Sequence, residues 1–311
     1  MTTATNHLMD KGKEGFYRTI KVLDDFGLLH TGTYENEDAY NRPCIIEVNG
    51  LKIAVLSYTY GSEGVDDDFF YEEENRFMTK LILTKRSKNY KRCLQIVKND
   101  FENARLLNAD LILVLPHMGE QFLHEPDSFQ RHWCNIFVKE GADIILSDHP
   151  HAVQPFEWRK NKDGKNVFIA HCPGNFLNTY TLHDGDASML VNVYVDKERK
   201  EPICASCVPL FAHCTEENGW YSLPICKAIK DENIYKSLSI YDRRRIEEVH
   251  RLVTKIAIGC ELGIDNVQDE YFYFANEGYK REHITPLDLS QFSGSKLLEI
   301  IKKSKSVCFV G

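Results

Sequence analysis

The chain has 311 residues, of which 43% are hydrophobic, 27% charged and 11% aromatic, and its formal net charge is -8. This length fits one large domain or two modest ones, and the aromatic content excludes a disordered chain. The acidic balance excludes a dedicated nucleic-acid binder, because phosphate contacts need a basic face. No apolar run is long enough for a membrane-spanning helix.

The first 90 residues predict a helix, a hairpin and a polar stretch. Apolar residues at helical spacing from Phe16 to Phe26 predict the helix. Cys44 to Val48 and Leu51 to Tyr58 flank an Asn-Gly pair, a strong turn signal, and predict a β-hairpin. The stretch from Thr59 to Asn89 is acidic in its first half and basic in its second. We interpret it as a solvated surface loop whose halves attract each other, with a cation-binding acidic loop as the alternative.

Helices and buried strands alternate over the next 60 residues. The predicted elements are helices around 94–104 and 129–137 and strands at 110–115 and 143–146. This alternation is typical of α/β proteins with covered sheets. Strands then follow without helices between them, which predicts a more antiparallel sheet; they lie at 167–170, 189–195 and 203–210.

The composition changes after about residue 215. Asp242 to Ile258 has one apolar face and predicts a strong amphipathic helix. We interpret Tyr271 to Phe274 as core packing against a neighbouring helix, with ligand stacking as the alternative. Cys204-x-x-Cys207 allows a zinc site, but both residues lie in a predicted strand, and buried thiols are the other interpretation.

Histidines follow two consecutive buried strands. His117 follows one strand, and His149 and His151 follow the next in Ser-Asp-His-Pro-His. Ligands of an α/β sheet gather at the carboxyl ends of its strands, and side chains i and i+2 of an extended chain share a face. Imidazole is a common ligand of transition metals. The pattern predicts a metal site, with a surface or hydrogen-bonding role for each histidine as the alternative.

Several motifs together carry a family resemblance. In chain order they are Asn6-His7-x-x-Asp10-x-Gly12, Leu115-x-His117-x-Gly119, His149-Pro-His151-x-x-Gln154-Pro155 and Pro173-Gly174-Asn175-Phe176. They resemble the CapA-type proteins, which are linked to poly-gamma-glutamate capsule synthesis and belong to the calcineurin-like metallophosphoesterase superfamily. The resemblance covers about residues 3–210. It implies an α/β fold of the metallophosphoesterase α/β/β/α sandwich type.

The resemblance also implies a role for each matching residue. The ligands of two divalent metal ions (manganese, iron, zinc or nickel) would be Asn6, His117, His149 and His151. The residues acting on the substrate phosphate would be His7, as general acid or transition-state stabiliser, and Asp10, which orients it. The residues that support these groups without binding the metal directly would be Glu120, Asp148 and Asn175.

Two features depart from the family pattern. Ser147-Asp148 replaces the usual Gly-His, and the added carboxylate would either support an imidazole or alter the metal preference. The acids that the superfamily supplies upstream of Asn6 have no match here. We expect a fragment of a longer protein. The alternatives are a degenerate relative that binds one metal or none, and substitution by other acids, such as those of the Glu63 to Glu74 loop.

These observations predict the organisation and function. Residues 1–215 would form the metallophosphoesterase-like domain without its N-terminal unit, 216–303 a helical extension, and 304–311 the first strand of a further α/β domain. We expect a metal-dependent phosphoester hydrolase of capsule or cell-surface polymer synthesis that acts on a phosphorylated or polymer-precursor small molecule. The alternative is a non-catalytic assembly or binding subunit of a polymer-synthesis complex. The chain alone, without a signal peptide, indicates the cytoplasm, and a preceding anchor would indicate membrane association.

Overall fold

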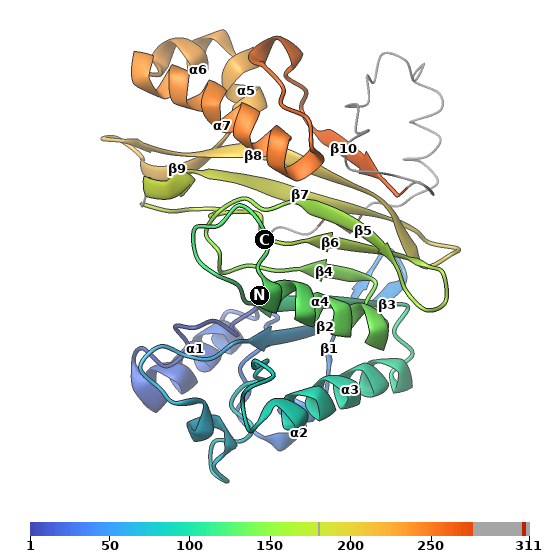
Figure 1. The fold of residues 1–311 in the computed structure, drawn as a ribbon. Coiled ribbons are helices and arrows are strands. Elements are labelled where there is room, and N and C mark those ends of the chain that lie inside the picture. Colours follow the sequence, from blue (N-terminus) through green and yellow to red (C-terminus); the bar gives the residue numbers. More distant parts are fainter. Residues whose placement is uncertain (180, 276–306, 309–311) are drawn as a thin grey trace. The chain divides into compact units, whose positions relative to one another are not determined.

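The computed structural model describes residues 1–179, 181–275 and 307–308, which divide into two compact units. Unit 1 comprises residues 1–119, 128–149 and 160–167, and unit 2 comprises 120–127, 150–159 and the described residues from Phe168 onward. Both units combine helices with sheet strands (Figure 1). The predicted α/β class is therefore confirmed.

Unit 1 is built on a sheet in which four strands lie in the order β1-β2-β3-β4. Its strands are β1 (Cys44–Val48), β2 (Leu51–Thr59), β3 (Leu111–His117) and β4 (Ile144–Leu146). Its α-helices are α1 (Gly12–Asp25), α2 (Glu37–Asn41), α3 (Tyr90–Leu106) and α4 (Ser128–Glu140). β1 and β2 form the predicted antiparallel hairpin, whose turn residues Asn49 and Gly50 have φ of 52° and 78°. β2, β3 and β4 pair in parallel, so their carboxyl ends share one edge.

Tyr58 of β2 shows how the helices of unit 1 cover the sheet. Its ring stacks on Phe137 of α4, with ring centroids 5.4 Å apart. Its hydroxyl donates to Asp100 of α3 at 2.9 Å. Both helices therefore pack on the face of the sheet that carries Tyr58, and burial of their apolar residues stabilises this side of unit 1.

The polar stretch 59–89 differs from its predicted character as a solvated loop. Its halves do attract each other, because Lys88 pairs with Asp68 at 2.5 Å. Residues 78–83, however, are buried, and Leu81 pairs in parallel with Thr59 at the end of β2. Even Lys80 is buried, in an ion pair with Asp100. The prediction followed the charged residues of the stretch and overlooked its apolar ones. Lys80 can be buried because its charge has a partner.

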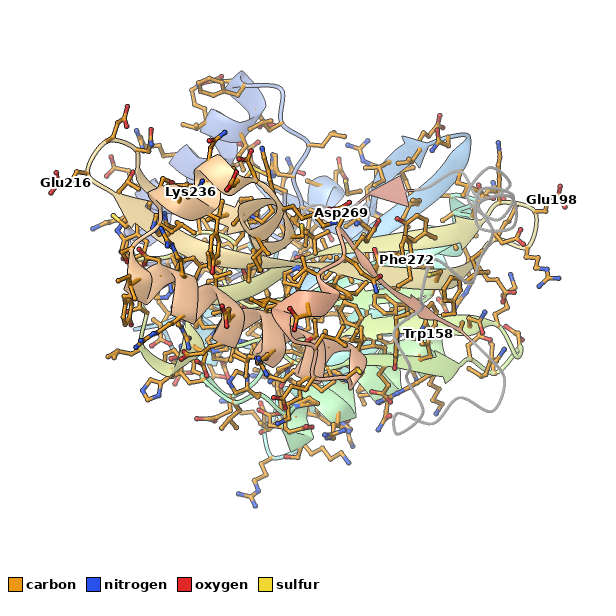
Figure 2. The ribbon with its side chains drawn as sticks, turned by 90° about the horizontal axis from the view of Figure 1, so that it is seen from above. Trp158, Glu198, Glu216, Lys236, Asp269 and Phe272 are labelled. Carbon is orange, nitrogen blue, oxygen red and sulfur yellow. The ribbon has the colours of Figure 1, made fainter. Side chains whose placement is uncertain are left out.

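Unit 2 contains an antiparallel sheet, in the order β10-β8-β7-β11 with β9 on β8. The prediction is confirmed for the strands at 189–195 and 203–210, whereas the predicted strand at 167–170 is not part of this sheet. The strands of this sheet are β7 (Ala187–Asp196), β8 (Glu201–Thr215), β9 (Gly219–Pro224), β10 (Tyr271–Phe274) and β11 (Val307–Cys308). β8 is long, and Glu198 and Glu216, which precede and follow it, lie at opposite sides of the view in Figure 2. The hairpin strands β5 (Phe156–Lys160) and β6 (Asn166–Ala170) precede this sheet in the chain.

The helices α5 (Ile225–Lys230), α6 (Glu232–Ser237) and α7 (Ile240–Ile258) follow β9 and lie on one side of the antiparallel sheet (Figure 1). Ser239 caps α7 by accepting from the backbone N–H of Asp242 at 3.0 Å. Tyr271 and Tyr273 of β10 are buried, and the hydroxyl of Tyr271 lies 2.6 Å from Nε2 of His250 on α7. The interpretation of this segment as core packing against a helix is confirmed.

The predicted domain limits remain predictions. The described part of 216–303 holds α5, α6 and α7, as expected, and also the strands β9 and β10. Residues 276–303 lie outside the described residues, as do 304–306 and 309–311. Of the predicted terminal strand, Val307–Cys308 is described, and it pairs antiparallel with β7.

Two further sequence features have a simple structural description. Cys204 and Cys207 of β8 are buried thiols, and burial raises the pKa of both. Within residues 1–179 and 181–275, no helix combines the length and apolar character needed to cross a membrane.

Candidate metal centre

Two predicted ligands meet at the carboxyl end of β3 in unit 1. His117 is the last residue of β3, and its Nε2 lies 2.9 Å from Oδ1 of Asn6, in the turn before α1. Both side chains are buried. The chain just before this turn passes close to Gly32, where φ is +105° and a Cβ would lie 2.6 Å from the backbone nitrogen of Ala4. Glycine at that position therefore lets the Asn6 turn approach the sheet.

Asp148 holds the other side of the His117 ring. Its Oδ1 lies 2.9 Å from Nδ1 of His117, and the two residues also pair as a parallel backbone bridge. An ionised carboxylate can only accept, so Nδ1 of His117 carries the hydrogen of this bond. The ring is thereby oriented with Nε2 toward Asn6, as in the carboxylate–histidine arrangement of metal sites.

Glu63 determines which end of the Asn6 amide faces His117. Nδ2 of Asn6 donates to Oε1 of Glu63 at 3.2 Å, and the backbone N–H of Glu63 donates to the carbonyl of Asn6 at 2.6 Å. The amide oxygen therefore faces Nε2 of His117. With the ring hydrogen of His117 on Nδ1, its Nε2 offers a lone pair, so an amide oxygen and an imidazole nitrogen lie beside each other as two donors that one cation can bind.

The ring of His149 lies against this pair. Its centroid is 4.7 Å from that of His117 and 4.8 Å from that of Tyr60. Tyr60 in turn lies nearly parallel to His117, at an interplanar angle of 6°. His149 has a φ of 98°, which costs a residue with a Cβ on the order of 1–3 kcal/mol. Backbone strain thus coincides with one of the predicted ligands.

The predicted ligands of unit 1 are of types that transition-metal ions bind. An amide oxygen from Asn6 and imidazoles from His117 and His149 are ligands that manganese, iron, nickel and zinc accept. No group of three or more His, Cys, Asp or Glu side chains with metal-site spacing occurs among the residues that the structure describes. The fit therefore depends on the amide oxygen of Asn6.

His7 and Asp10 are placed on the surface of the same turn. Nδ1 of His7 lies 3.0 Å from Oδ2 of Asp10, and 62% of the His7 side chain is exposed. The backbone N–H of His7 donates to Oγ1 of Thr5. The predicted orienting partner of His7 is therefore in contact with it, and the imidazole is open to solvent.

The remaining predicted site residues belong to unit 2. Nδ1 of His151 lies 2.8 Å from Oδ1 of Asn175, whose Nδ2 donates to the carbonyl of His151 at 3.2 Å. Asn175, one of the residues expected to support the site, therefore contacts the imidazole of His151. Phe122 stacks on the same imidazole, with centroids 6.0 Å apart. Glu120 is exposed.

Tyr60 and Glu63 are not among the site residues predicted from the sequence. Glu63 had a signal, because acids of the 63–74 loop were one candidate replacement for the unmatched upstream acids. Tyr60 had none, since an aromatic residue after a buried strand is common in any core.

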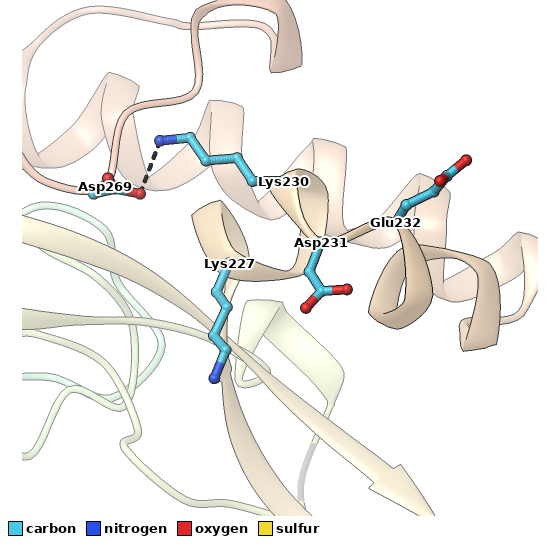
Figure 3. A pocket seen from close by; sticks show the side chains of 5 residues that line it. All are labelled: Lys227, Lys230, Asp231, Glu232 and Asp269. Atoms are coloured by element: carbon cyan, nitrogen blue, oxygen red, sulfur yellow. Dashed lines mark hydrogen bonds and ion pairs between the residues drawn. The ribbon is translucent and has the colours of Figure 1, made fainter.

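A hollow of about 620 Å³ in unit 2 contains none of these residues (Figure 3). Its lining side chains carry both signs of charge: Lys227, Lys230, Asp231, Glu232 and Asp269. Nζ of Lys230 pairs with Oδ1 of Asp269 at 2.8 Å, which neutralises part of this surface.

Comparison with known proteins places the motifs in a family. The family model described as "Bacterial capsule synthesis protein PGA_cap" matches residues 1–180, more than half of the chain. The chain belongs to this family. The matched range includes every motif that carried the resemblance to the CapA-type proteins, so that resemblance is confirmed.

Two relatives with CapA names are similar to the chain at modest identity. One is "Capsule biosynthesis protein CapA" of Bacillus anthracis, 29% identical over 182 residues, which are 57% of this chain and 39% of the relative. Another is "PGA biosynthesis protein CapA" of Bacillus subtilis (strain 168), 28% identical over 158 residues, which are 50% of this chain and 38% of the relative. The matched part of this PGA_cap chain thus spans about two fifths of the length of these relatives.

Proposed function

We propose that this chain serves the synthesis of a capsule or cell-surface polymer of the poly-gamma-glutamate type as a metal-dependent phosphoester hydrolase. Family membership supports the biological role. The contact between Oδ1 of Asn6 and Nε2 of His117 carries the chemical part, because an amide oxygen and an imidazole nitrogen lie side by side and can bind the same cation. The proposal includes the metallophosphoesterase α/β/β/α sandwich and a phosphorylated or polymer-precursor small molecule as substrate.

In this proposal the residues of unit 1 hold one metal ion. Asn6 binds through its amide oxygen, and His117 and His149 bind through their imidazoles. Asp148 keeps the His117 ring in the orientation that presents Nε2. When bound, a divalent cation lowers the pKa of a water ligand and offsets the negative charge of a phosphoester. His151 is the proposed ligand for a second ion.

His7 is the proposed group that handles the leaving-group proton. Asp10 accepts from Nδ1 of His7, and this bond fixes the ring orientation. The exposed ring can reach a bound phosphoester, donate a hydrogen bond to it and transfer a proton to the departing oxygen. Loss of such a group costs about 10²- to 10⁴-fold in rate.

Metal content and phosphodiesterase activity of the full chain test the proposal. The purified chain is equilibrated with manganese, its bound metal is measured by mass spectrometry, and hydrolysis of bis(p-nitrophenyl) phosphate is followed. We expect stoichiometric metal in the parent protein and loss of metal and activity in His117→Ala and His149→Ala. His7→Ala should retain the metal and lose activity.

A second Asp–His pair in unit 1 provides a matched control. His30 and Asp24 lie 3.2 Å apart away from the proposed ligands, so His30→Ala should change neither metal content nor activity. If the parent protein binds only trace metal and neither His117→Ala nor His149→Ala alters hydrolysis, the enzyme proposal is wrong. A non-catalytic subunit of a polymer-synthesis complex is then the function to pursue.

A further inference from the structure

We infer that Glu63 is a positioning residue of the metal centre: it holds the Asn6 amide with its oxygen toward the cation. The inference rests on the proposed function, because a positioning role requires that a metal binds. Its structural evidence is the geometry around Asn6. Glu63 comes from the acidic stretch after β2 and has no counterpart among the residues that carried the family resemblance.

An asparagine ligand needs a device that chooses between the two ends of its amide. Oxygen and nitrogen of the amide have nearly the same shape, and only the oxygen can bind a cation. Rotation of the amide by half a turn would place Nδ2 toward the site and repel the ion. The acceptor that prevents this rotation is Oε1 of Glu63, which takes a hydrogen bond from Nδ2 at 3.2 Å.

Glu63 is held in place from two directions. Its backbone N–H donates to the carbonyl of Asn6 at 2.6 Å, which ties the two chain segments together. The hydroxyl of Tyr60 donates to the same Oε1 at 3.3 Å. Because the ring of Tyr60 also packs beside His117 and His149, one side chain connects the carboxylate with both imidazoles.

The negative charge of Glu63 favours cation binding, as does its hydrogen bond to Asn6. Asn6, His117 and His149 are neutral donors when they bind a metal, so they leave the charge of a divalent ion uncompensated. Asp148 stands behind His117, and Glu63 stands behind Asn6. Two carboxylates that contact the ligands therefore balance the ion without binding it directly.

Metal affinity of the parent protein and two variants tests the inference. Manganese and zinc binding to the full chain are measured by calorimetry for the parent, Glu63→Leu and Glu63→Gln. We expect Glu63→Leu to bind about tenfold more weakly, the lower end of the effect of such partners, because Glu63 is exposed and water can replace part of the bond. Glu63→Gln keeps an acceptor for Nδ2 and should stay within about threefold of the parent.

The same stretch offers a matched control. Oε2 of Glu72 accepts from Nδ2 of Asn75 at 3.0 Å, so Glu72→Leu removes a Glu–Asn bond of the same type outside the centre. Its metal affinity should equal that of the parent. Equal affinities for the parent and Glu63→Leu, or equal losses in Glu63→Leu and Glu72→Leu, overturn the inference.

A second readout works without metal and separates this inference from the proposed function. The ring nitrogens of His117 are followed by nuclear magnetic resonance in metal-free protein with labelled histidine, assigned with His117→Ala. Glu63→Leu releases the Asn6 amide and should shift the Nε2 resonance, whereas Glu63→Gln and Glu72→Leu should not. A parent protein that binds no metal refutes the proposed function. An unshifted resonance in Glu63→Leu refutes the positioning role.

Discussion

The buried ion pair between Lys80 and Asp100 makes a strong prediction about stability. Only 3% and 4% of the two side chains are exposed, and Nζ lies 2.5 Å from Oδ1. Tyr58 donates to the other carboxylate oxygen at 2.9 Å, and the Lys80 ammonium lies 4.7 Å from the ring centre of Tyr40. Replacement of Lys80 by methionine keeps an unbranched side chain without the ammonium and leaves Asp100 buried without its charge partner.

The expected loss of stability follows from that burial. Burial raises the pKa of Asp100, and Lys80 and Tyr58 oppose the rise. Without Lys80, the site must hold an unpaired carboxylate or take up a proton, and removal of one partner of a buried pair costs about 3–5 kcal/mol. The double variant Lys80→Met/Asp100→Leu has no buried charge, so its cost should fall to about 1–3 kcal/mol, mostly from the unpaired Tyr58 hydroxyl.

Urea denaturation followed by circular dichroism measures these differences. Lys88 and Asp68 provide the control, because their atoms are also 2.5 Å apart while 74% and 50% of their side chains are exposed. Lys88→Met should cost no more than about 1 kcal/mol. The reasoning is refuted if the double variant is as unstable as Lys80→Met, or if Lys80→Met costs no more than Lys88→Met.

Three further changes have predictable effects. Burial alone would raise the pKa of Glu157, but hydrogen bonds from His171 and Arg159 hold it at about 2. Because the pKa is lower in the folded state, the ionised carboxylate stabilises the fold. This contribution is present above the unfolded pKa near 4.5 and disappears as the pH falls toward 2. As the pH falls through this range, Glu157→Gln should therefore lose about 1–2 kcal/mol less stability than the parent, a figure that allows for the partial exposure of Glu157. Melting temperatures measured at a series of acidic pH values test this. Gly119→Ala should cost about 2–4 kcal/mol in urea denaturation, because φ is +117° and the new Cβ would lie 2.5 Å from the buried Gln130 side chain. Ser239→Ala removes the N-terminal cap of α7 and should cost about 1 kcal/mol in the same assay.

Two of these changes have a control variant, and the third has an outcome that would contradict it. Gly164→Ala has a φ of +75° with no atom within 4 Å of the added Cβ, so it should cost less than Gly119→Ala. Equal costs would show that the clash with Gln130 does not matter. An unchanged acid profile in Glu157→Gln contradicts the role of that carboxylate, and Ser239→Gly should restore most of what Ser239→Ala loses.

Much of the fold was predictable because its signals are local. The Asn-Gly turn, the apolar period of α7 and the short buried runs of β3 and β4 each depend on residues within a few positions of one another. The polar stretch 59–89 was misjudged for the opposite reason. Lys80 is buried only because Asp100, 20 residues away, reaches it from α3.

The candidate site was also predictable from the sequence only in part. The order and spacing of the His, Asn and Asp motifs identified the family and its candidate ligands, since these are properties of the chain itself. Asn6 and His117 are 111 residues apart, and their Oδ1 and Nε2 atoms come within 2.9 Å of each other only because the sheet edge brings the two segments together. Glu63 faces the Asn6 amide, 57 residues away, only because the segment after β2 folds back over the turn before α1. The sequence shows which side chains could bind a metal, whereas the orientation of these side chains depends on partners that only the tertiary structure supplies.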